Sequence, residues 1–364
     1  MRRLLVFMLI ALAVLQNAPP AFAQRRRSPR SAGTNLLDML GILPESVKSI
    51  LVLYLARNAT KEKAGELEAE LRTKPDNTES RLTLIGYYSW NGKNMVDRVR
   101  LRTHVVWFVE NHPEHPATQE PILRDLPDDR EGNALILAQW EKNLETRGNE
   151  LEVLKNAEKF FFSRDPAQAE EILHRLAQRE PLNEEWPREL ALLYRMFGVP
   201  NYRPAETDDA AGVALEGYRR VLELTRGSAA RETLAGDMAE SAFKAGDFTG
   251  AAKLAKLHLE SGEGSAVHRA NTILGRVALR SDDIVNAKRH LIDSSRAQTA
   301  HHISTWGPRM ILAKELLDEN ERDTVVEYLQ NCLLLWPRGE NLLHYWIADI
   351  KSGRKPNFGN LGLQ

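Results

Sequence analysis

The spacing of apolar residues predicts helices along most of the chain. Apolar residues recur every three or four positions, for example at Ala169, Ile172, Leu173 and Leu176, and this spacing lays one apolar stripe along a helix. Alanine, leucine, glutamate and arginine, which all favour helices, dominate the same segments. Almost no segment alternates apolar and polar residues as a half-exposed strand would. The pattern therefore predicts an all-α fold.

Turn-forming residues interrupt the helical pattern at short, regular intervals. Glycine, proline, asparagine and aspartate are the residues that most often end helices or form tight turns. We therefore expect pairs of antiparallel helices joined by tight turns. The interruptions are Asn91-Gly92, Asp165-Pro166, Gly246-Asp247, Asp282-Asp283 and Glu319-Asn320.

Small residues and prolines return at fixed places when the chain is divided into frames of about 34 residues. In the frame that begins at Glu150, Ala157 is the eighth residue, Ala169 the twentieth and Pro181 the thirty-second. This register resembles the tetratricopeptide repeat, a helix–turn–helix unit of about 34 residues. The resemblance covers residues 150–337 well and residues 78–113 more loosely, and about eleven extra residues around 201–209 interrupt it. Further frames begin at Glu184, Glu232, His268 and Trp306, with Ala191, Ala239, Gly275 and Ala313 at their eighth places.

The resemblance implies a right-handed α-solenoid of stacked helix–turn–helix units. One helical hairpin cannot bury its own apolar face, so several hairpins must stack. Small residues at the eighth and twentieth places let the two helices of a unit approach closely, and a proline ends the second helix because it lacks an amide hydrogen. An irregular α-helical bundle is the alternative that the same pattern allows.

Five segments are expected along the chain. Prolines gather in irregular loops between His112 and Asp129, which we expect to separate an N-terminal portion from the longer array. The segments are a signal peptide (1–23), a flexible basic leader (24–34), an N-terminal helical or repeat-like region (35–129), a repeat-like array ending in a capping helix (130–351) and a frayed, flexible tail (352–364).

The first 23 residues have the three parts of a secretory signal. Arg2 and Arg3 precede an apolar run over residues 4–15, and Ala21-Phe22-Ala23 has the small residues of a cleavage site. The apolar run is shorter than the roughly 20 residues that a membrane-spanning helix needs. We therefore expect cleavage, no membrane span in the mature chain, and a location in the bacterial periplasm or outside the cell. An uncleaved anchor is the alternative.

The composition excludes several classes of protein. With 43% apolar residues in 364, the chain has ample material for a large core, so it is neither disordered nor collagen-like. The 49 basic and 50 acidic side chains give a net charge of −1, which argues against nucleic acid as a partner. The single cysteine, Cys332, excludes an intramolecular disulfide framework and a multi-thiolate metal site, and we expect its thiol to be buried and inert.

No sequence motif indicates catalysis, a metal or a cofactor. The chain lacks a glycine-rich phosphate loop, a zinc-protease motif and a nucleophile elbow. His112 and His115 form the nearest approach to a ligand cluster, but no third ligand is evident. Adjacent acidic pairs such as Asp282-Asp283 fall at helix starts, where the helix dipole favours them. The seven tryptophans are expected to be packing anchors at the junctions between repeats.

Basic residues outnumber acidic ones at the places that line the concave face in proteins of the resembled family. We hypothesise that this face binds an acidic peptide segment through charge-assisted hydrogen bonds, with an ordinary solvated helix face as the alternative. The expected function is a non-enzymatic scaffold for protein–protein interactions, and the alternative is an α-helical toroid enzyme or binding protein that acts on polysaccharide. The partner-binding residues would be Arg188, Arg195, Lys244, Arg269, Arg276, Arg280 and Lys314.

Overall fold

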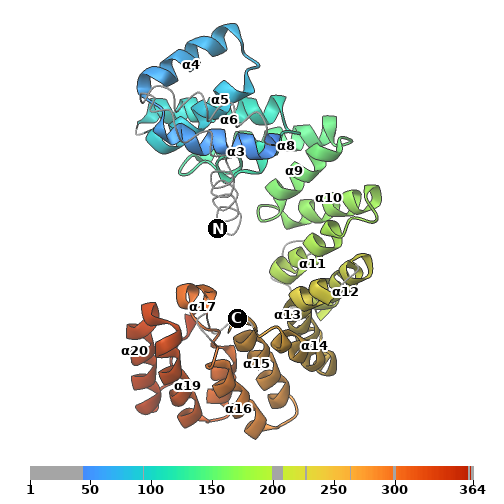
Figure 1. The fold of residues 1–364 in the computed structure, drawn as a ribbon, viewed down its shortest axis with the longest axis vertical. Coiled ribbons are helices and arrows are strands. Elements are labelled where there is room, and N and C mark those ends of the chain that lie inside the picture. Colours follow the sequence, from blue (N-terminus) through green and yellow to red (C-terminus); the bar gives the residue numbers. More distant parts are fainter. Residues whose placement is uncertain are drawn as a thin grey trace, which may run out of the picture. The chain divides into compact units, whose positions relative to one another are not determined.

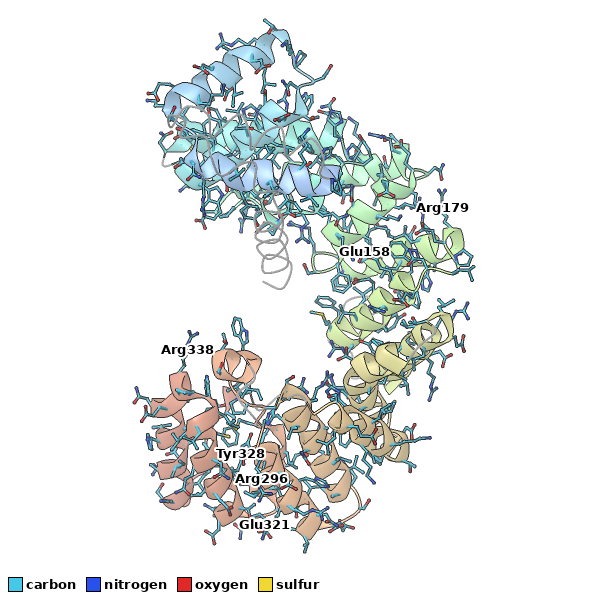
Figure 2. All side chains as sticks on the ribbon, viewed as in Figure 1. Glu158, Arg179, Arg296, Glu321, Tyr328 and Arg338 are labelled. Atoms are coloured by element: carbon cyan, nitrogen blue, oxygen red, sulfur yellow. The ribbon has the colours of Figure 1, made fainter. Side chains whose placement is uncertain are left out.

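The computed structural model shows an all-α protein (Figure 1). It describes residues 44–92, 94–198, 208–225, 228–262, 264–297, 301–359 and 361, and Figure 2 adds their side chains. These residues form eighteen α-helices, α3 to α20, and no strand, which confirms that the fold is all-α. The expected signal peptide and leader (1–34) lie outside the described residues. The chain divides into an N-terminal unit, Met1–Glu141, and a C-terminal unit, Lys142–Gln364.

The N-terminal unit packs around α5. This helix contacts α3, α4 and α6, and its residues Leu84 and Ile85 are fully buried. Val105 and Phe108 of α6 are equally buried. The α-helices of this unit are α3 (Glu45–Leu55), α4 (Lys61–Thr73), α5 (Thr78–Asn91), α6 (Met95–Asn111), α7 (Pro121–Arg124) and α8 (Arg130–Arg147), the last of which continues into the C-terminal unit.

Hydrogen bonds to one carboxylate attach the polar helix α4 to the rest of the N-terminal unit. Glu68 of α4 accepts a hydrogen bond from the Tyr88 hydroxyl at 2.9 Å, and His104 Nε2 lies 3.1 Å from the same oxygen. On its other nitrogen, His104 faces the Arg81 guanidinium at 3.4 Å. Because an arginine only donates, His104 carries its proton on Nε2 and donates it to Glu68. Burial lowers the pKa of His104 and keeps the ring neutral.

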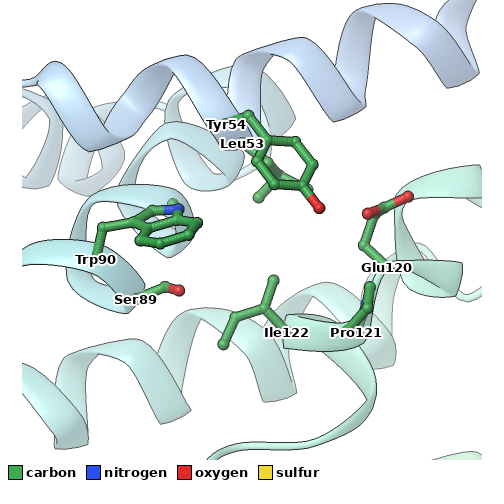
Figure 3. Close-up of a pocket in the computed structure, with 8 residues that line it drawn as sticks. Leu53, Tyr54, Ser89, Trp90, Glu120, Pro121 and Ile122 are labelled. Carbon is green, nitrogen blue, oxygen red and sulfur yellow. The ribbon is translucent and has the colours of Figure 1, made fainter. Parts of the chain in front are cut away.

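A cavity of about 160 Å³ lies between α3, α5 and the start of α7 (Figure 3). It adjoins the closest approach of α3 and α5, where a Cβ on Gly86 would lie 2.3 Å from the backbone oxygen of Leu53. The two helices can therefore touch only because residue 86 has no side chain. The cavity is lined by Leu53, Tyr54, Gly86, Ser89, Trp90, Glu120, Pro121 and Ile122.

In the C-terminal unit, most helices that follow one another in the sequence also contact each other in space. Contacts also join helices that are not successive: α13 contacts α15, α15 contacts α18, and α16 contacts α19. Helices such as α13, α15 and α16 are therefore covered by more than their hairpin partners. The helices are α9 (Leu151–Phe161), α10 (Pro166–Arg179), α11 (Glu185–Phe197), α12 (Asp208–Leu224), α13 (Ser228–Lys244), α14 (Phe248–Glu260), α15 (Gly264–Leu279), α16 (Ile284–Ser294), α17 (His301–Trp306), α18 (Ile311–Asp318), α19 (Arg322–Leu335) and α20 (Glu340–Lys351).

Small residues lie at the helix contacts, as the sequence register predicts. Ala157, Ala169 and Ala239 are fully buried. A Cβ on Gly217 would lie 2.9 Å from the Cβ of Ala191, so α11 and α12 are already as close as these residues allow. Larger side chains at such places would force the helices apart.

Aspartate caps and left-handed residues form the turns between paired helices. The side chains of Asp165, Asp247 and Asp283 each accept a hydrogen bond from the backbone amide three residues later, at the starts of α10, α14 and α16. Gly246 and Asp282 adopt left-handed conformations, with φ of 80° and 56°. The helix breaks predicted at these positions are therefore confirmed.

Two predictions about the end of the chain differ from the structure. The frame from Trp306 does not begin with a helix, because Gly307 has φ of 90° and α18 begins only at Ile311. Most described residues of the tail are exposed, but Phe358 and Leu361 attach it to the C-terminal unit. Phe358 is 5% exposed and lies edge-on to Trp346, and the Leu361 carbonyl accepts a hydrogen bond from the Met310 amide at 2.8 Å.

The tryptophans differ in part from expectation. Trp140, Trp186 and Trp346 are buried packing residues, as predicted, but Trp90 and Trp306 are 57% and 66% exposed. The division between the two units falls inside α8, after Glu141. The proline-containing segment before α8 buries Ala117, Thr118 and Leu123 within the N-terminal unit.

Removal of the aspartate cap of α14 is expected to destabilise the C-terminal unit. Asp247 Oδ1 accepts the Gly250 amide at 2.8 Å, and loss of such a cap costs about 1 kcal/mol. Asp247→Ala should therefore lower the free energy of unfolding by about that amount, as measured by urea denaturation followed by circular dichroism. Asp247→Ser, which keeps an acceptor, is the matched control. Equal stability of the alanine and serine variants would contradict the role assigned to the cap.

Candidate functional site

The described residues offer few groups suited to catalysis or metal binding. No cluster of three or more histidine, cysteine, aspartate or glutamate side chains in this part of the chain could hold a metal ion. None of the described helices has both the length and the apolar character needed to cross a membrane. Cys332 is fully buried, and burial raises the pKa of its thiol to about 12, so it stays protonated at neutral pH.

One carboxyl group in the C-terminal unit titrates near neutral pH. Glu158 of α9 is fully buried, with the Lys159 ammonium 3.1 Å from its Oε2 (Figure 2). Burial raises its pKa to about 7, opposed by the positive charge of Lys159. That ammonium also lies 3.0 Å from Glu189 of α11, so one cation serves carboxylates on two helices. A general acid needs a pKa in this range, but a substrate cannot reach a side chain with no exposed surface.

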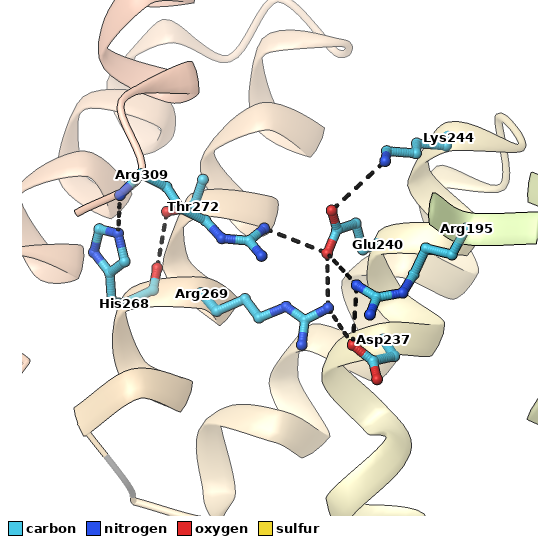
Figure 4. A network of polar contacts seen from close by, with 8 residues as sticks. All are labelled: Arg195, Asp237, Glu240, Lys244, His268, Arg269, Thr272 and Arg309. Carbon is cyan, nitrogen blue, oxygen red and sulfur yellow. Dashed lines mark hydrogen bonds and ion pairs between the residues drawn. The ribbon is translucent and has the colours of Figure 1, made fainter. Parts of the chain in front are cut away.

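Three of the predicted binding residues meet in one polar network of the C-terminal unit (Figure 4). Arg269 of α15 donates to Asp237 at 2.6 Å and to Glu240 at 2.7 Å. Arg195 of α11 lies 3.4 Å from Asp237, and Lys244 lies 3.7 Å from Glu240. We call this set, together with Arg309, the arginine network. It joins helices from three pairs.

Glu240 is the centre of the arginine network. Its side chain is 14% exposed and lies within 4 Å of Arg195, Lys244, Arg269 and Arg309. Burial by itself would raise the pKa of this carboxyl, but the surrounding cations, Arg309 first, hold it well below its usual range. Glu240 is therefore ionised at neutral pH.

Arg309 joins the network from the segment between α17 and α18, and the sequence register did not predict it. Its guanidinium lies 3.3 Å from Glu240, which is 69 residues earlier in the chain. Its backbone amide donates to His268 Nε2 at 2.8 Å, and its carbonyl accepts from the Tyr328 hydroxyl at 3.1 Å. Its backbone is therefore anchored at both ends. The Gly307-Pro308 pair was the available signal, since it marks a break before a helix.

His268 anchors Arg309 as a neutral side chain. Its Nδ1 lies 3.1 Å from the Ser294 carbonyl, which only accepts, so the proton is on Nδ1 and Nε2 accepts from the Arg309 amide. Complete burial lowers the pKa of His268 to about 4. The ring is therefore uncharged at neutral pH and adds no positive charge beside Arg309.

A second cluster, which we call the Glu315 cluster, contains two further predicted residues. Arg276 of α15 binds Glu315 of α18 through Nε and Nη2 at 3.0–3.1 Å, and Arg280 donates to the same carboxylate at 3.0 Å. The guanidinium carbons of Arg276 and Arg280 lie 4.2 and 5.4 Å from the ring centre of Phe243. Phe243 is on α13, so this ring places the Glu315 cluster beside the arginine network.

The remaining two predicted residues stand outside these clusters. Arg188 of α11 pairs with Glu184 one turn earlier, at 2.8 Å, with 42% of its side chain exposed. An exposed pair of this kind contributes little to stability. Lys314 is exposed on α18, next in sequence to Glu315. Five of the seven predicted residues thus lie in the two clusters, and two do not.

Cations outnumber carboxylates in the two clusters. Arg195, Lys244, Arg269 and Arg309 share Asp237 and Glu240, and Arg276 and Arg280 share Glu315. Among the described residues, six positive charges therefore face three negative ones. Each of these cations shares its carboxylate with at least one other cation. An added anion could therefore accept further charge-assisted hydrogen bonds from them, which favours its binding. The side chains of Lys244 and Arg280 are 51% and 39% exposed, so water and ligands can reach them.

Comparison with models of known protein families and with characterised proteins finds no match to this chain.

Replacement of Glu240 is expected to destabilise the C-terminal unit. Removing one partner from a buried ion pair costs about 3 kcal/mol, because the cations left behind are desolvated and unpaired. Glu240→Gln should therefore lower the free energy of unfolding by about 3 kcal/mol at pH 7. Glu216→Gln is the control, since Glu216 is 70% exposed. The measurement is urea denaturation.

Wild type and Glu240→Gln also test how the contribution of Glu240 to stability depends on pH. The pKa of Glu240 is lower in the folded state than the ordinary 4.5, so its stabilising effect is complete above pH 4.5 and is lost as the pH falls below it. The stability difference between wild type and Glu240→Gln should therefore shrink below pH 4.5. A difference that stays constant down to pH 3 would contradict this assignment.

Glu158 is expected to show the opposite pH dependence. Its pKa is raised from 4.5 to about 7 on folding, so its burial costs nothing below pH 4.5 and becomes fully unfavourable above pH 7. A shift of this size corresponds to about 3 kcal/mol. Relative to wild type, Glu158→Gln should thus gain about 3 kcal/mol of stability between pH 4 and pH 8, measured by urea denaturation. Glu152→Gln, an exposed change on the same helix, should show no such gain.

Proposed function

We propose that this protein is a non-enzymatic scaffold whose C-terminal unit is a tetratricopeptide-like solenoid that binds an acidic segment of a partner protein. The proposal includes export of the chain to the periplasm or the extracellular space, based on the signal-like sequence of residues 1–23. The support for the repeat architecture is the recurrence of small residues at helix contacts and the pairing of successive helices.

The excess of cations in the two clusters is the observation that carries the binding proposal. These cations come from α11, α13, α15 and the segment before α18, which are separate elements joined by shared carboxylates. A peptide that offers carboxylates at intervals could contact several of these elements at once. The whole chain has 49 basic and 50 acidic side chains, so the local excess of cations does not follow from a generally basic composition.

The exposed cations of the clusters, together with Lys314 next to Glu315 in the sequence, are expected to provide the binding energy. Lys244, Arg280 and Lys314 are exposed and are not central to the network, so their replacement leaves the buried pairs in place. The variant Lys244→Ala/Arg280→Ala/Lys314→Ala should bind a fluorescent ten-residue polyglutamate peptide at least about tenfold more weakly than wild type, as measured by fluorescence anisotropy, since each lost charge-assisted bond contributes about 1 kcal/mol or more.

The matched control removes two exposed arginines from another helix. Arg219 and Arg220 of α12 are about half exposed and pair only with neighbours on their own helix. Arg219→Ala/Arg220→Ala should bind the peptide as wild type does. Wild-type binding should also weaken as salt is added. The proposal fails if wild type does not bind the peptide, or if both variants lose affinity equally.

A further inference from the structure

The cavity of the N-terminal unit has walls of two kinds. Two aromatic rings, Trp90 and Tyr54, border it together with the aliphatic side chains of Leu53 and Ile122. One acidic side chain, Glu120, borders it as well. Figure 3 shows Trp90 and Glu120 on opposite sides of the cavity, with Tyr54 between them and its hydroxyl directed toward Glu120.

The aromatic walls are open to ligands. Trp90 is 57% exposed and Tyr54 is 37% exposed, although tryptophan and tyrosine usually bury most of their surface in a folded domain. The floor behind them is rigid, because α3 and α5 are in direct contact at Gly86. The exposed rings therefore border a formed cavity and not a loose surface.

The negative charge of Glu120 acts on this cavity. The pKa of Tyr54 is raised, first by burial and then by the charge of Glu120, which places that charge near the phenol. The electron-rich faces of tryptophan and tyrosine also attract cations. Aromatic rings and a carboxylate around one space therefore favour a positively charged ligand over a neutral one.

The apolar lining selects among cations. A primary ammonium carries three N–H donors and holds its water strongly, so it loses energy in a cavity that offers few acceptors. A quaternary ammonium has no N–H donor, and its methyl groups can contact Leu53, Ile122 and the two rings. The size agrees, since a cavity of about 150 Å³ holds one benzene-sized molecule, and a trimethylammonium group is of similar size.

We propose that the cavity formed by Tyr54, Trp90, Glu120 and Ile122 binds the trimethylammonium group of a small ligand of the choline type. The methyl groups would occupy the cavity, the positive charge would lie against the rings and face Glu120, and the rest of the ligand would extend into solvent. This site is in the N-terminal unit and is independent of the function proposed for the C-terminal unit.

The test compares a cation with its neutral isostere. Isothermal titration calorimetry on the full chain would measure the binding of choline and of 3,3-dimethyl-1-butanol, in which carbon replaces the charged nitrogen. We expect choline to bind about tenfold more tightly, because the aromatic faces and the carboxylate attract the charged compound and not the neutral one. Equal binding of the two compounds, or no binding of choline, would overturn the proposal.

Variants assign the binding to this cavity. Glu120→Gln should weaken choline binding several-fold and leave the binding of 3,3-dimethyl-1-butanol unchanged. Trp90→Leu should abolish choline binding, while Trp306→Leu, which replaces another exposed tryptophan in the other unit, should not change it. If Trp306→Leu has the same effect as Trp90→Leu, the proposed site is wrong. Circular dichroism would show that each variant is folded.

A second arm distinguishes a free ligand from a lipid headgroup. Sedimentation with phosphatidylcholine vesicles would be compared with sedimentation with phosphatidylglycerol vesicles. If the ligand is free, choline binds and neither vesicle retains the protein. Retention by phosphatidylcholine vesicles that depends on Trp90 would contradict a small free ligand and would assign the same chemistry to a lipid.

Discussion

The helices of the C-terminal unit depend on close contact through small side chains. Each of these helices carries an apolar stripe that its hairpin partner cannot cover alone, so it must also pack against the next pair. Fully buried residues such as Ala157, Ala191 and Ala239 allow the backbones to approach closely enough for this. On α20, the last of the described helices, the Phe358 ring lies edge-on against Trp346.

The positions of the charged residues follow from this packing. Once the apolar stripes face neighbouring helices, the arginines of the first helices lie on another side, close to the carboxylates of adjacent pairs. Each ion pair between an arginine and a carboxylate is strengthened by its low exposure, because the effective dielectric constant inside the protein is lower than in water. Glu240 can therefore hold four cations from different elements. The network thus joins helix pairs and still leaves an excess of positive charge.

The two units differ in their chemistry. The described C-terminal unit concentrates guanidinium groups, whereas the cavity of the N-terminal unit combines aromatic rings with Glu120. The two proposed sites would therefore select ligands of opposite charge. The difference arises from packing as well as from composition: α5 is central to the N-terminal unit and approaches α3 at Gly86, which leaves a hollow beside the contact.

The sequence by itself determined the helices, their turns and the small residues at their contacts. These features depend on short-range properties: apolar periodicity, the turn preferences of residues such as Gly246, and caps such as Asp247. The positions of Arg269 and Arg276 on first helices were predictable in the same way. Their partners Asp237 and Glu315 were not, because each pair joins residues more than 30 positions apart.

Tertiary structure alone decided burial and long-range pairing. The sequence has no signal that Glu158 is fully buried while Trp90 is exposed, since each outcome depends on which helix faces that position. Arg309 reaches Glu240 across 69 residues only because its backbone is held by His268 and Tyr328. Local preferences act over one or two turns of chain, whereas the sites arise where packing brings distant turns together.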